Sequence, residues 1–194
     1  MRKLGKNTRA LAFAGVFCAL TVVIQLATAP LAAPLGPLGQ QLVTGSLVNL
    51  SLILCCCLAG LLPGLGVGLV TPFVAALCGI LPPFLVLLPF MALGNMAIVA
   101  TWRTLISIKT SRNAHVRRII AAVCGAIVKT SVLYLGIVRL ALPYLTNAPP
   151  AQAAKITAMF SLPQMFTALI GGGVACLVLP LLGKVGPAEH KNNS

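Results

Sequence analysis

The stretch CGAIVKTSVLYLG, residues 124–136, places one lysine, Lys129, in the middle of an apolar run. Small and aliphatic residues continue on both sides, so the run is long enough for a membrane-crossing helix, which needs about 20 residues. A charged side chain at the centre of such a helix costs about 2.5–3.5 kcal/mol on insertion scales. Lys129 is therefore expected to face the interior of a helix bundle or a cavity, where it marks a candidate site.

The composition of the chain also requires lipid as its solvent. Of the 194 residues, 59% are hydrophobic and 8% are charged, whereas soluble domains carry about 25% charged residues. Such a chain cannot cover itself with a polar surface. Its length fits a single membrane domain over residues 1–194.

Six apolar runs approach the length that crosses a bilayer. We expect an all-α integral membrane protein with six transmembrane helices, at residues 10–27, 43–62, 65–81, 84–106, 119–144 and 156–182. Pro and Gly argue against regular helix between several of them. We therefore predict a Pro- and Gly-rich loop at 29–41 and tight turns at 62–66 and 81–83. A polar loop at 107–118 and a closing loop at 146–155 complete the connections.

The basic residues predict the orientation. Fourteen Lys and Arg stand against one acid, Glu189. With the N-terminus inside, eleven of the fourteen fall in cytoplasmic segments, and only Lys129, Arg139 and Lys155 remain for the membrane and the outer side. Short basic loops mark the cytoplasmic side, so both termini are expected there. Because these residues flank apolar runs, the net charge of +13 does not indicate nucleic-acid binding.

The beginning of the chain allows a second interpretation. A basic start, an apolar core and small residues after it also describe a cleaved signal peptide. We expect this segment to remain as the first span, because the rest of the chain already needs a membrane. The topology of the later helices is the same in either case.

Several chemical functions lack their usual residues. The sequence contains no G-x-x-x-x-G-K-[ST] phosphate-binding loop, and no Asp, Glu or His lies in any expected span. Proton-coupled carriers usually relay protons through such groups. The seven cysteines show no metal-ligand spacing, and no nucleophile–base set appears. We therefore expect neither an enzyme, nor a metal or cofactor site, nor a transporter that energises itself.

The surroundings of Lys129 suggest an anion. On a helical wheel Gly125, Lys129 and Gly136 share one face, where glycine admits a ligand or another helix. Arg139 lies about 15 Å nearer the outer surface at 1.5 Å per residue, and with Lys155 it forms a basic approach. The structural alternative is a neutral or backbone-bonded lysine that holds helices together.

Other polar side chains fall inside the apolar runs. Asn49, Asn95 and Gln164 are amides, accompanied by Thr71 and Ser161. Asn95 follows Pro89, a candidate helix kink. Such amides either orient a ligand or bond a neighbouring helix. Together with Lys129 they would suit a polar organic molecule with an anionic or carbonyl group.

Small residues on the first expected helix form a different feature. Ala10 and Ala14, and likewise Gly15 and Ala19, are spaced by four. This pattern allows close helix packing. It serves either packing within the chain or contact with a partner helix at the cytoplasmic end.

Four segments of the chain resemble a known family. VTGSLVNLSLIL (43–54), TPFVAALCGILPP (71–83), PFMALGN (89–95) and MFSLPQMFTALIGG (159–172) are similar to segments of the substrate-binding S components of energy-coupling factor (ECF) transporters. The similarity covers about residues 9 to 183.

The resemblance implies a mechanism that the residues alone do not give. S components are six-helix proteins of the bacterial plasma membrane that capture a micronutrient, usually a vitamin, from outside. They associate with a transmembrane coupling protein and two cytoplasmic ATPases, whose ATP hydrolysis drives release inside. In several members an A-x-x-x-A pattern on the first helix meets the coupling protein, and Ala10 and Ala14 match it. The ligand site lies near the outer side, where Lys129, Asn95, Gln164 and the 29–41 loop are expected.

Three hypotheses follow. The first is an S component for a small polar nutrient such as pantothenate, riboflavin or a folate, bound by Lys129, Asn95, Gln164, Arg139 and Asn49. The second is a stand-alone carrier or channel, which would work in cells without the coupling protein and ATPases. The third is a membrane scaffold, which would show no saturable ligand.

Overall fold

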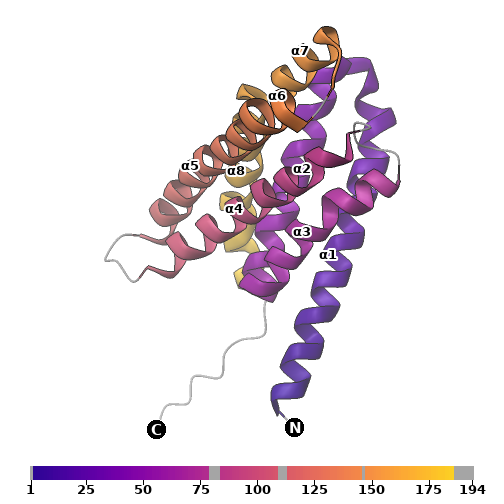
Figure 1. The fold of residues 1–194 in the computed structure, drawn as a ribbon. Helices are drawn as coiled ribbons and strands as arrows, with labels where there is room; N and C mark the ends of the chain where they lie inside the picture. Colours follow the sequence, from indigo (N-terminus) through magenta and orange to yellow (C-terminus); the bar gives the residue numbers. More distant parts are fainter. Residues whose placement is uncertain (1, 79–83, 109–112, 146, 186–194) are drawn as a thin grey trace, which may run out of the picture.

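The computed structural model describes residues 2–78, 84–108, 113–145 and 147–185. The described residues form a bundle of helices joined by short connections (Figure 1). Its elements are α1 (Arg2–Ala32), η1 (Ala33–Leu35), α2 (Gly36–Ala59), α3 (Leu61–Leu77), η2 (Leu85–Leu87), α4 (Leu88–Ser107), α5 (Ala114–Leu133), η3 (Tyr134–Ala141), α6 (Leu142–Leu145), α7 (Pro150–Met159) and α8 (Leu162–Val185).

The helices carry the apolar lengths of a membrane protein. Four described stretches are long and apolar enough to cross a membrane: Thr8–Ala59, Leu85–Ser107, Ala114–Tyr144 and Pro150–Leu182. The apolar helix Leu61–Leu77 is shorter. The first stretch has 52 residues and comprises α1 and α2, which pack against each other. The all-helical membrane architecture is confirmed, but the exact count of six separate spans is not supported by these lengths.

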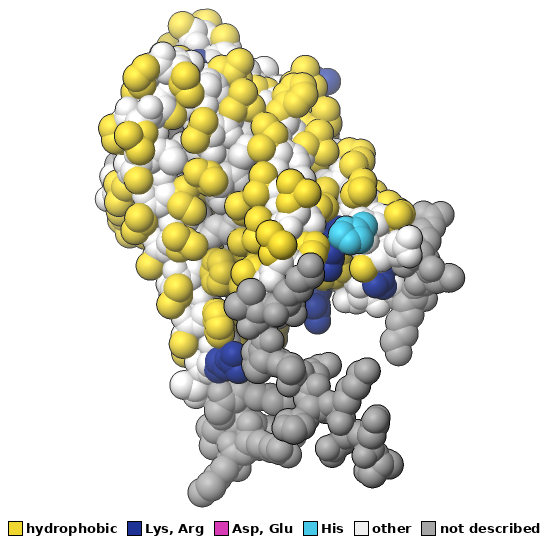
Figure 2. All heavy atoms as spheres, turned by 180° about the vertical axis from the view of Figure 1, so that it is seen from behind, with side chains coloured by type: hydrophobic (Ala, Val, Ile, Leu, Met, Phe, Trp, Pro, Cys, Tyr) yellow, Lys and Arg dark blue, Asp and Glu magenta, His cyan; other side chains and the backbone are white. Residues whose placement is uncertain are grey.

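The two ends of the bundle are formed by different helices. The N-terminal end of α1 and the C-terminal end of α8 lie at the same end, the lower end of Figure 1, and α6 and α7 lie at the opposite end. Helix α2 packs against α1, α3, α4 and α8, and α5 packs against α4 and α8. The face drawn in Figure 2 is mainly hydrophobic, with most of its Lys and Arg toward the lower end. This distribution suits a surface in contact with lipid.

The break between α2 and α3 differs from the predicted turn at 62–66. The chain turns at Gly60, whose φ of 107° is readily adopted only by glycine. Pro63 instead lies in the first turn of α3. A proline is tolerated there because the first turn of a helix has no intrahelical partner for its N–H groups.

The predicted last span, 156–182, is divided in the structure. Helix α7 ends at Met159, the chain turns at 160–161, and α8 begins at Leu162. The predicted closing loop at 146–155 is also wrong in part, because α7 already begins at Pro150. Proline favours the first helical position, so Pro150 here starts a helix rather than preventing one.

Four further expectations met different outcomes. The predicted loop at 29–41 is largely helical, since α1 continues through Pro30 to Ala32 and α2 begins at Gly36. Pro89 lies in the first turn of α4, so it does not kink the helix at Asn95. The predicted turn at 81–83 lies outside the described residues, and the loop at 107–118 is described only in part, with helix resuming at Ala114.

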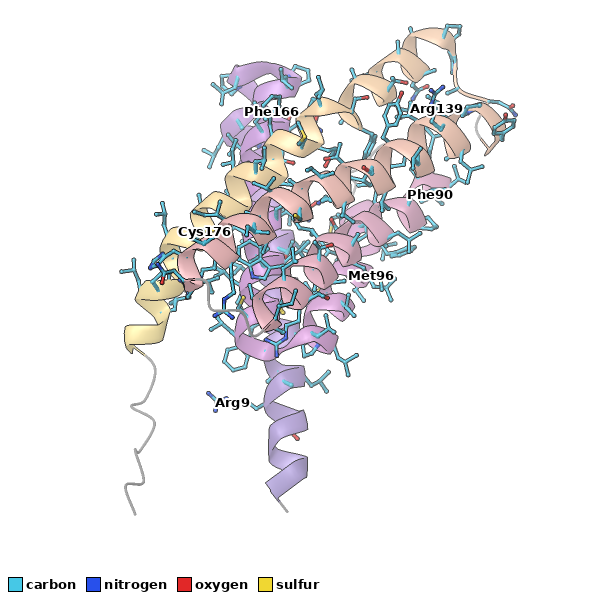
Figure 3. All side chains as sticks on the ribbon, turned by 90° about the vertical axis from the view of Figure 1, so that its left-hand side faces the viewer. Arg9, Phe90, Met96, Arg139, Phe166 and Cys176 are labelled. Carbon is cyan, nitrogen blue, oxygen red and sulfur yellow. The ribbon has the colours of Figure 1, made fainter. Side chains whose placement is uncertain are left out.

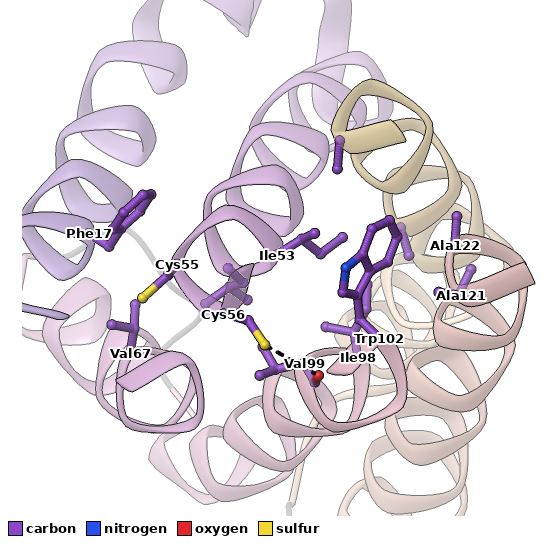
Figure 4. Packing of buried hydrophobic residues seen from close by; sticks show 14 residues of the cluster. Phe17, Ile53, Cys55, Cys56, Val67, Ile98, Val99, Trp102, Ala121 and Ala122 are labelled. Atoms are coloured by element: carbon purple, nitrogen blue, oxygen red, sulfur yellow. Dashed lines mark hydrogen bonds between the residues drawn. The ribbon is translucent and has the colours of Figure 1, made fainter. Parts of the chain in front are cut away.

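An apolar core of buried side chains packs between the helices in the lower half of the bundle, and Figure 4 shows this packing from close by. Trp102, Leu52 and Val99 are fully buried in it. Glycines bring the backbones close: a Cβ at Gly172 would lie 2.9 Å from Ala122 Cβ, and one at Gly64 would lie 3.0 Å from Cys56 Cα. Such close approach by small residues is how helices pack in lipid. This core fixes the lower ends of α2, α4, α5 and α8.

Candidate functional site

Lys129 lies where three helices meet. Its Nζ donates hydrogen bonds to Asn49 Oδ1 on α2, at 2.6 Å, and to Asn95 Oδ1 on α4, at 2.9 Å. Only 4% of the Lys129 side chain is exposed. The structure therefore brings together three of the residues that the sequence singled out separately.

The two asparagines account for the depth of the lysine. Hydrogen bonds to a charged group contribute about 1.5–3 kcal/mol each, so two of them offset an insertion cost of about 2.5–3.5 kcal/mol. Both acceptors are neutral, and the only acid of the chain, Glu189, lies outside the described residues. The lysine amino group is thus hydrogen-bonded by two amides and has no carboxylate partner among the described residues.

Each asparagine extends the network to another helix. Asn49 Nδ2 donates to Thr167 Oγ1 on α8, at 3.3 Å. Asn95 Nδ2 lies 3.5 Å from the Gly68 carbonyl oxygen on α3, a long hydrogen bond. Because the Lys129 amino group donates, both amides turn their oxygens toward it. The network around Lys129 joins α2, α3, α4, α5 and α8.

Two glycines permit this geometry by close backbone approach. A Cβ at Gly171 on α8 would lie 2.6 Å from the Ser46 carbonyl oxygen and 2.8 Å from Asn49 Cβ. A Cβ at Gly68 on α3 would lie 3.3 Å from the carbonyl carbon of Asn95. Any larger residue at Gly171 would push α8 away from the backbone that carries Asn49.

Lys129, Asn49 and Asn95 form part of the wall of a cavity of about 350 Å³. This volume is at the small end of ligand pockets, which run from about 300 to 1,000 Å³. The polar lining consists of six amides, two hydroxyls and two cations: Gln25, Gln40, Gln41, Asn49, Asn95, Gln164, Thr44, Thr71, Lys129 and Lys155. Pro37, Val48, Pro72, Met91, Leu133, Met159 and Phe160 supply most of the apolar lining. Amides both donate and accept, so the cavity suits a small organic molecule with carbonyl or hydroxyl groups and a negative charge.

Helix α7 borders the cavity and is tied to the bundle at its last turn. Gln41 Nε2 donates to the Met159 carbonyl oxygen at 2.6 Å, and Gln164 Nε2 donates to the same oxygen at 3.3 Å. Carbonyls in the last turn of a helix have no intrahelical partner, so two side-chain amides take that role here. Lys155 of α7 also lines the cavity.

Arg139 does not join this cavity. It is exposed, and its guanidinium lies 5.8 Å from the centre of the Tyr134 ring. Figure 3 places Arg139 and Arg9 at opposite ends of the bundle. Residues 134–141 form a π-helix, so the helical register beyond Tyr134 differs from the regular one assumed from the sequence.

The predicted glycine face of α5 packs against a helix rather than lining the cavity. A Cβ at Gly125 would lie 3.2 Å from Ile98 Cγ1, and one at Gly136 would lie 2.5 Å from Phe90 Cδ1. Both neighbours belong to α4. The sequence left two alternatives for these glycines, close approach of a ligand or close approach of another helix. In the structure, another helix approaches them.

Sequence reasoning singled out Asn49 but not the three glutamines of α1 and α2 that also line the cavity, Gln25, Gln40 and Gln41. Gln41, Gly45 and Asn49 are spaced by four and so share one face of α2. This signal was hidden because residues 29–41 read as a loop. Gln25, 7% exposed on α1, interrupts an otherwise apolar run, which is itself a sign of function in a membrane helix.

The small residues of α1 are divided between core and surface. Ala14 packs against the apolar core, while Gly15 and Ala19 are exposed. Ala10 is half-buried. Packing within the chain therefore uses part of this face, and the remainder stays accessible.

Comparison with known families identifies the chain. The family model described as "ECF transporter, substrate-specific component" matches residues 9–183. The chain therefore belongs to this family, in agreement with the resemblance seen in the sequence. Neither the curated proteins nor the solved structures give a match.

Membership settles the class of protein. The substrate-specific components are substrate-capture subunits of membrane importers and are not enzymes. The family implies association with the ECF transmembrane and ATPase components, which are separate proteins. The apolar helices agree with a multi-pass membrane protein.

Proposed function

We propose that the chain captures a small polar micronutrient, a vitamin with an anionic or carbonyl group, in the cavity around Lys129. Pantothenate, riboflavin and folate-like compounds are the candidates. Two of them carry carboxylates, whereas riboflavin carries carbonyl and hydroxyl groups and no carboxylate. A protonated Lys129 that pairs with no carboxylate of the described residues favours the carboxylate-bearing members.

One observation carries this proposal: a buried lysine faces a cavity with amide partners and no carboxylate among the described residues. An ammonium group has three N–H donors, and its hydrogen bonds to described residues use two. The third is available to a ligand. Lys155, which also lines the cavity, would add a second cation for an anionic substrate.

We further propose a six-span topology with both termini in the cytoplasm of a bacterial cell. Its support is the packing of α1 against α2 within one 52-residue apolar stretch, with α3 as a short span. Both ends of the chain then lie on the side that carries most of the basic residues. The cavity, bordered by α7, faces outward in this orientation.

The remaining site residues have supporting roles in this proposal. Arg139, outside the cavity, adds to the positive field that attracts anions at the outer end. Ala10 and Ala14, both half-buried, would contact the transmembrane coupling protein through the parts of their surface that stay accessible beside the apolar core. That protein and two cytoplasmic ATPases would drive release of the substrate inside.

The experiment is a thermal-shift screen of the purified chain with pantothenate, riboflavin and folate. A ligand that binds only the folded state raises its melting temperature. We expect a saturable rise for at least one compound, and a much smaller one in Lys129→Met. Absence of any saturable stabilisation would contradict capture of these compounds, and an equal rise in Lys129→Met would contradict the role of the lysine.

A further inference from the structure

A second cavity, of about 360 Å³, lies at the other end of the bundle. It is lined by residues at the C-terminal ends of α2, α4 and α8 and at the N-terminal end of α5. These helix ends lie at the end of the bundle where α1 begins and α8 ends (Figure 1). In the proposed topology this is the level of the inner membrane leaflet.

The charged groups of this cavity are two arginines in the first turns of α5. The Arg117 Nη1 donates to the Ile108 carbonyl oxygen at 2.9 Å, but its Nε is buried without a partner among the described residues. Arg118 is half-buried and makes no hydrogen bond to another described residue. Both line the cavity, so it holds guanidinium donors that the described fold leaves partly unused.

Two neutral features add to these donors. The indole Nε1 of Trp102, a fully buried residue, has no oxygen acceptor among the described residues, and its one neighbouring acceptor there is the Cys57 thiol. It faces α2 (Figure 4), whose Cys57, a weak acceptor at best, also lines the cavity. In addition, α5 begins without a side-chain cap from Asn113, which leaves its first N–H groups and the positive end of its dipole beside the cavity at Ala114.

The rest of the lining is hydrocarbon. Leu58, Ile106, Leu179 and Leu182 complete the wall, and Leu58 and Leu182 are exposed on the outside of the bundle. A free anion would satisfy the donors but leave this apolar wall in contact with water. A molecule with an anionic head and acyl chains satisfies both parts.

We propose that this cavity binds the phosphate headgroup of an anionic phospholipid from the inner leaflet, with its acyl chains along Leu58 and Leu182. Arginine matches phosphate oxygens in bidentate geometry. Basic pockets between membrane helices on the cytoplasmic side are typical seats for anionic headgroups. The bound lipid bridges the ends of α2, α4, α5 and α8, and this inference does not depend on which nutrient the protein captures.

The test is native mass spectrometry of the full chain, purified and titrated with phosphatidylglycerol or phosphatidylcholine of identical chains. We expect the anionic lipid to bind about tenfold more tightly, a difference of about 1.4 kcal/mol. Arg117→Gln/Arg118→Gln should abolish this preference. Arg9→Gln/Arg103→Gln removes the same charge from exposed arginines of α1 and α4 that do not line the cavity, and it should keep the preference.

Two further arms separate the remaining outcomes. Trp102→Phe keeps an aromatic ring but removes the indole N–H. It should lower the affinity for the anionic lipid about two- to threefold. Inorganic phosphate at millimolar concentration should not displace the lipid. Thermal unfolding of each variant verifies that it is folded.

Several results would overturn the proposal. Equal loss of preference in both double variants would indicate only a general surface charge effect. Displacement by inorganic phosphate would indicate a site for a free anion. If Arg117→Gln/Arg118→Gln keeps the lipid but no longer co-purifies with the coupling protein, the arginines serve an acidic protein surface instead.

Discussion

The two halves of the bundle are built by the same helices but for opposite purposes. In the lower half α2, α4 and α5 meet around Cys56, Trp102 and Ala122 in an apolar core. In the upper half the same three helices meet around Asn49, Asn95 and Lys129 at a cavity. In each helix the two positions are seven residues apart, which is about two turns along one face.

This comparison shows how a small membrane bundle separates stability from binding. The lower half is held by close packing of small and large apolar side chains, which tolerates little movement. The upper half has a smaller apolar cluster around Leu133, Ile137 and Phe160, and it adds the hydrogen bonds to one lysine and the amides that tie α7 to the bundle. We therefore expect changes in the lower half to alter stability and changes in the upper half to alter affinity.

The largest expected effect is on affinity, in Lys129→Met. Removing one member of a buried, hydrogen-bonded charge set costs about 2–5 kcal/mol, so the affinity for an anionic ligand should fall at least about 30-fold. Isothermal titration of the detergent-solubilised protein measures it. Arg139→Gln, which removes an equal charge outside the cavity, should change affinity less than about threefold. Equal losses in the two variants would remove the distinction between the cavity and the outer surface.

The run Gly171, Gly172 and Gly173 tests both halves within one turn of α8. A Cβ at position 171 meets the α2 backbone beside Asn49, and a Cβ at position 172 meets Ala122 of the apolar core. A Cβ at position 173 meets no atom within 4 Å. Overpacking costs about 1–3 kcal/mol. Gly171→Ala should lower both melting temperature and affinity, and Gly172→Ala only the melting temperature. Gly173→Ala should lower neither, and a loss of affinity in it would contradict the geometry.

A carboxylate placed beside the lysine should weaken capture. In Asn95→Asp the new charge pairs with Lys129 and competes with an anionic ligand, so affinity should fall about tenfold while the protein stays folded. Asn147→Asp adds the same charge in the exposed segment before α7 and serves as the control. Unchanged affinity in Asn95→Asp would show that the ligand does not use the positive charge.

The smallest expected effect concerns α7. Gln41→Leu removes the shorter of the two hydrogen bonds to the Met159 carbonyl oxygen, worth about 0.5–1.5 kcal/mol. Stopped-flow dissociation should become about two- to tenfold faster. Gln152→Leu, on α7 but outside the cavity lining, should leave the rate unchanged. An unchanged rate in Gln41→Leu would show that this contact does not control release.

The sequence predicted the class of fold from its apolar runs, and it singled out the residues of the candidate site from the polar groups inside those runs. A lysine in an apolar run is too costly to leave unsatisfied, so Lys129, Asn49 and Asn95 could be singled out before their contacts were known. The hydrogen-bond partners of Lys129 could not be assigned, because the spacing of residues along separate helices does not tell which amides face the lysine. The structure supplied that pairing.

The local breaks were harder to predict, because proline both starts and stops helices. Pro63, Pro89 and Pro150 all lie in first turns, whereas two of these prolines were assigned to turns or loops and the third to a kink. The π-helical segment at 134–141 has no signal in the apolar pattern. Its effect on Arg139 therefore could not be foreseen.

The central claim is that Lys129 recognises a negative charge on the captured nutrient. The direct measurement is a double-mutant cycle by isothermal titration. It uses wild type and Lys129→Met with the carboxylate ligand found in the screen and with its neutral amide analogue. We predict that the wild type loses at least about 30-fold in affinity for the neutral analogue, whereas Lys129→Met binds both forms equally weakly. Equal discrimination by both proteins would contradict the claim.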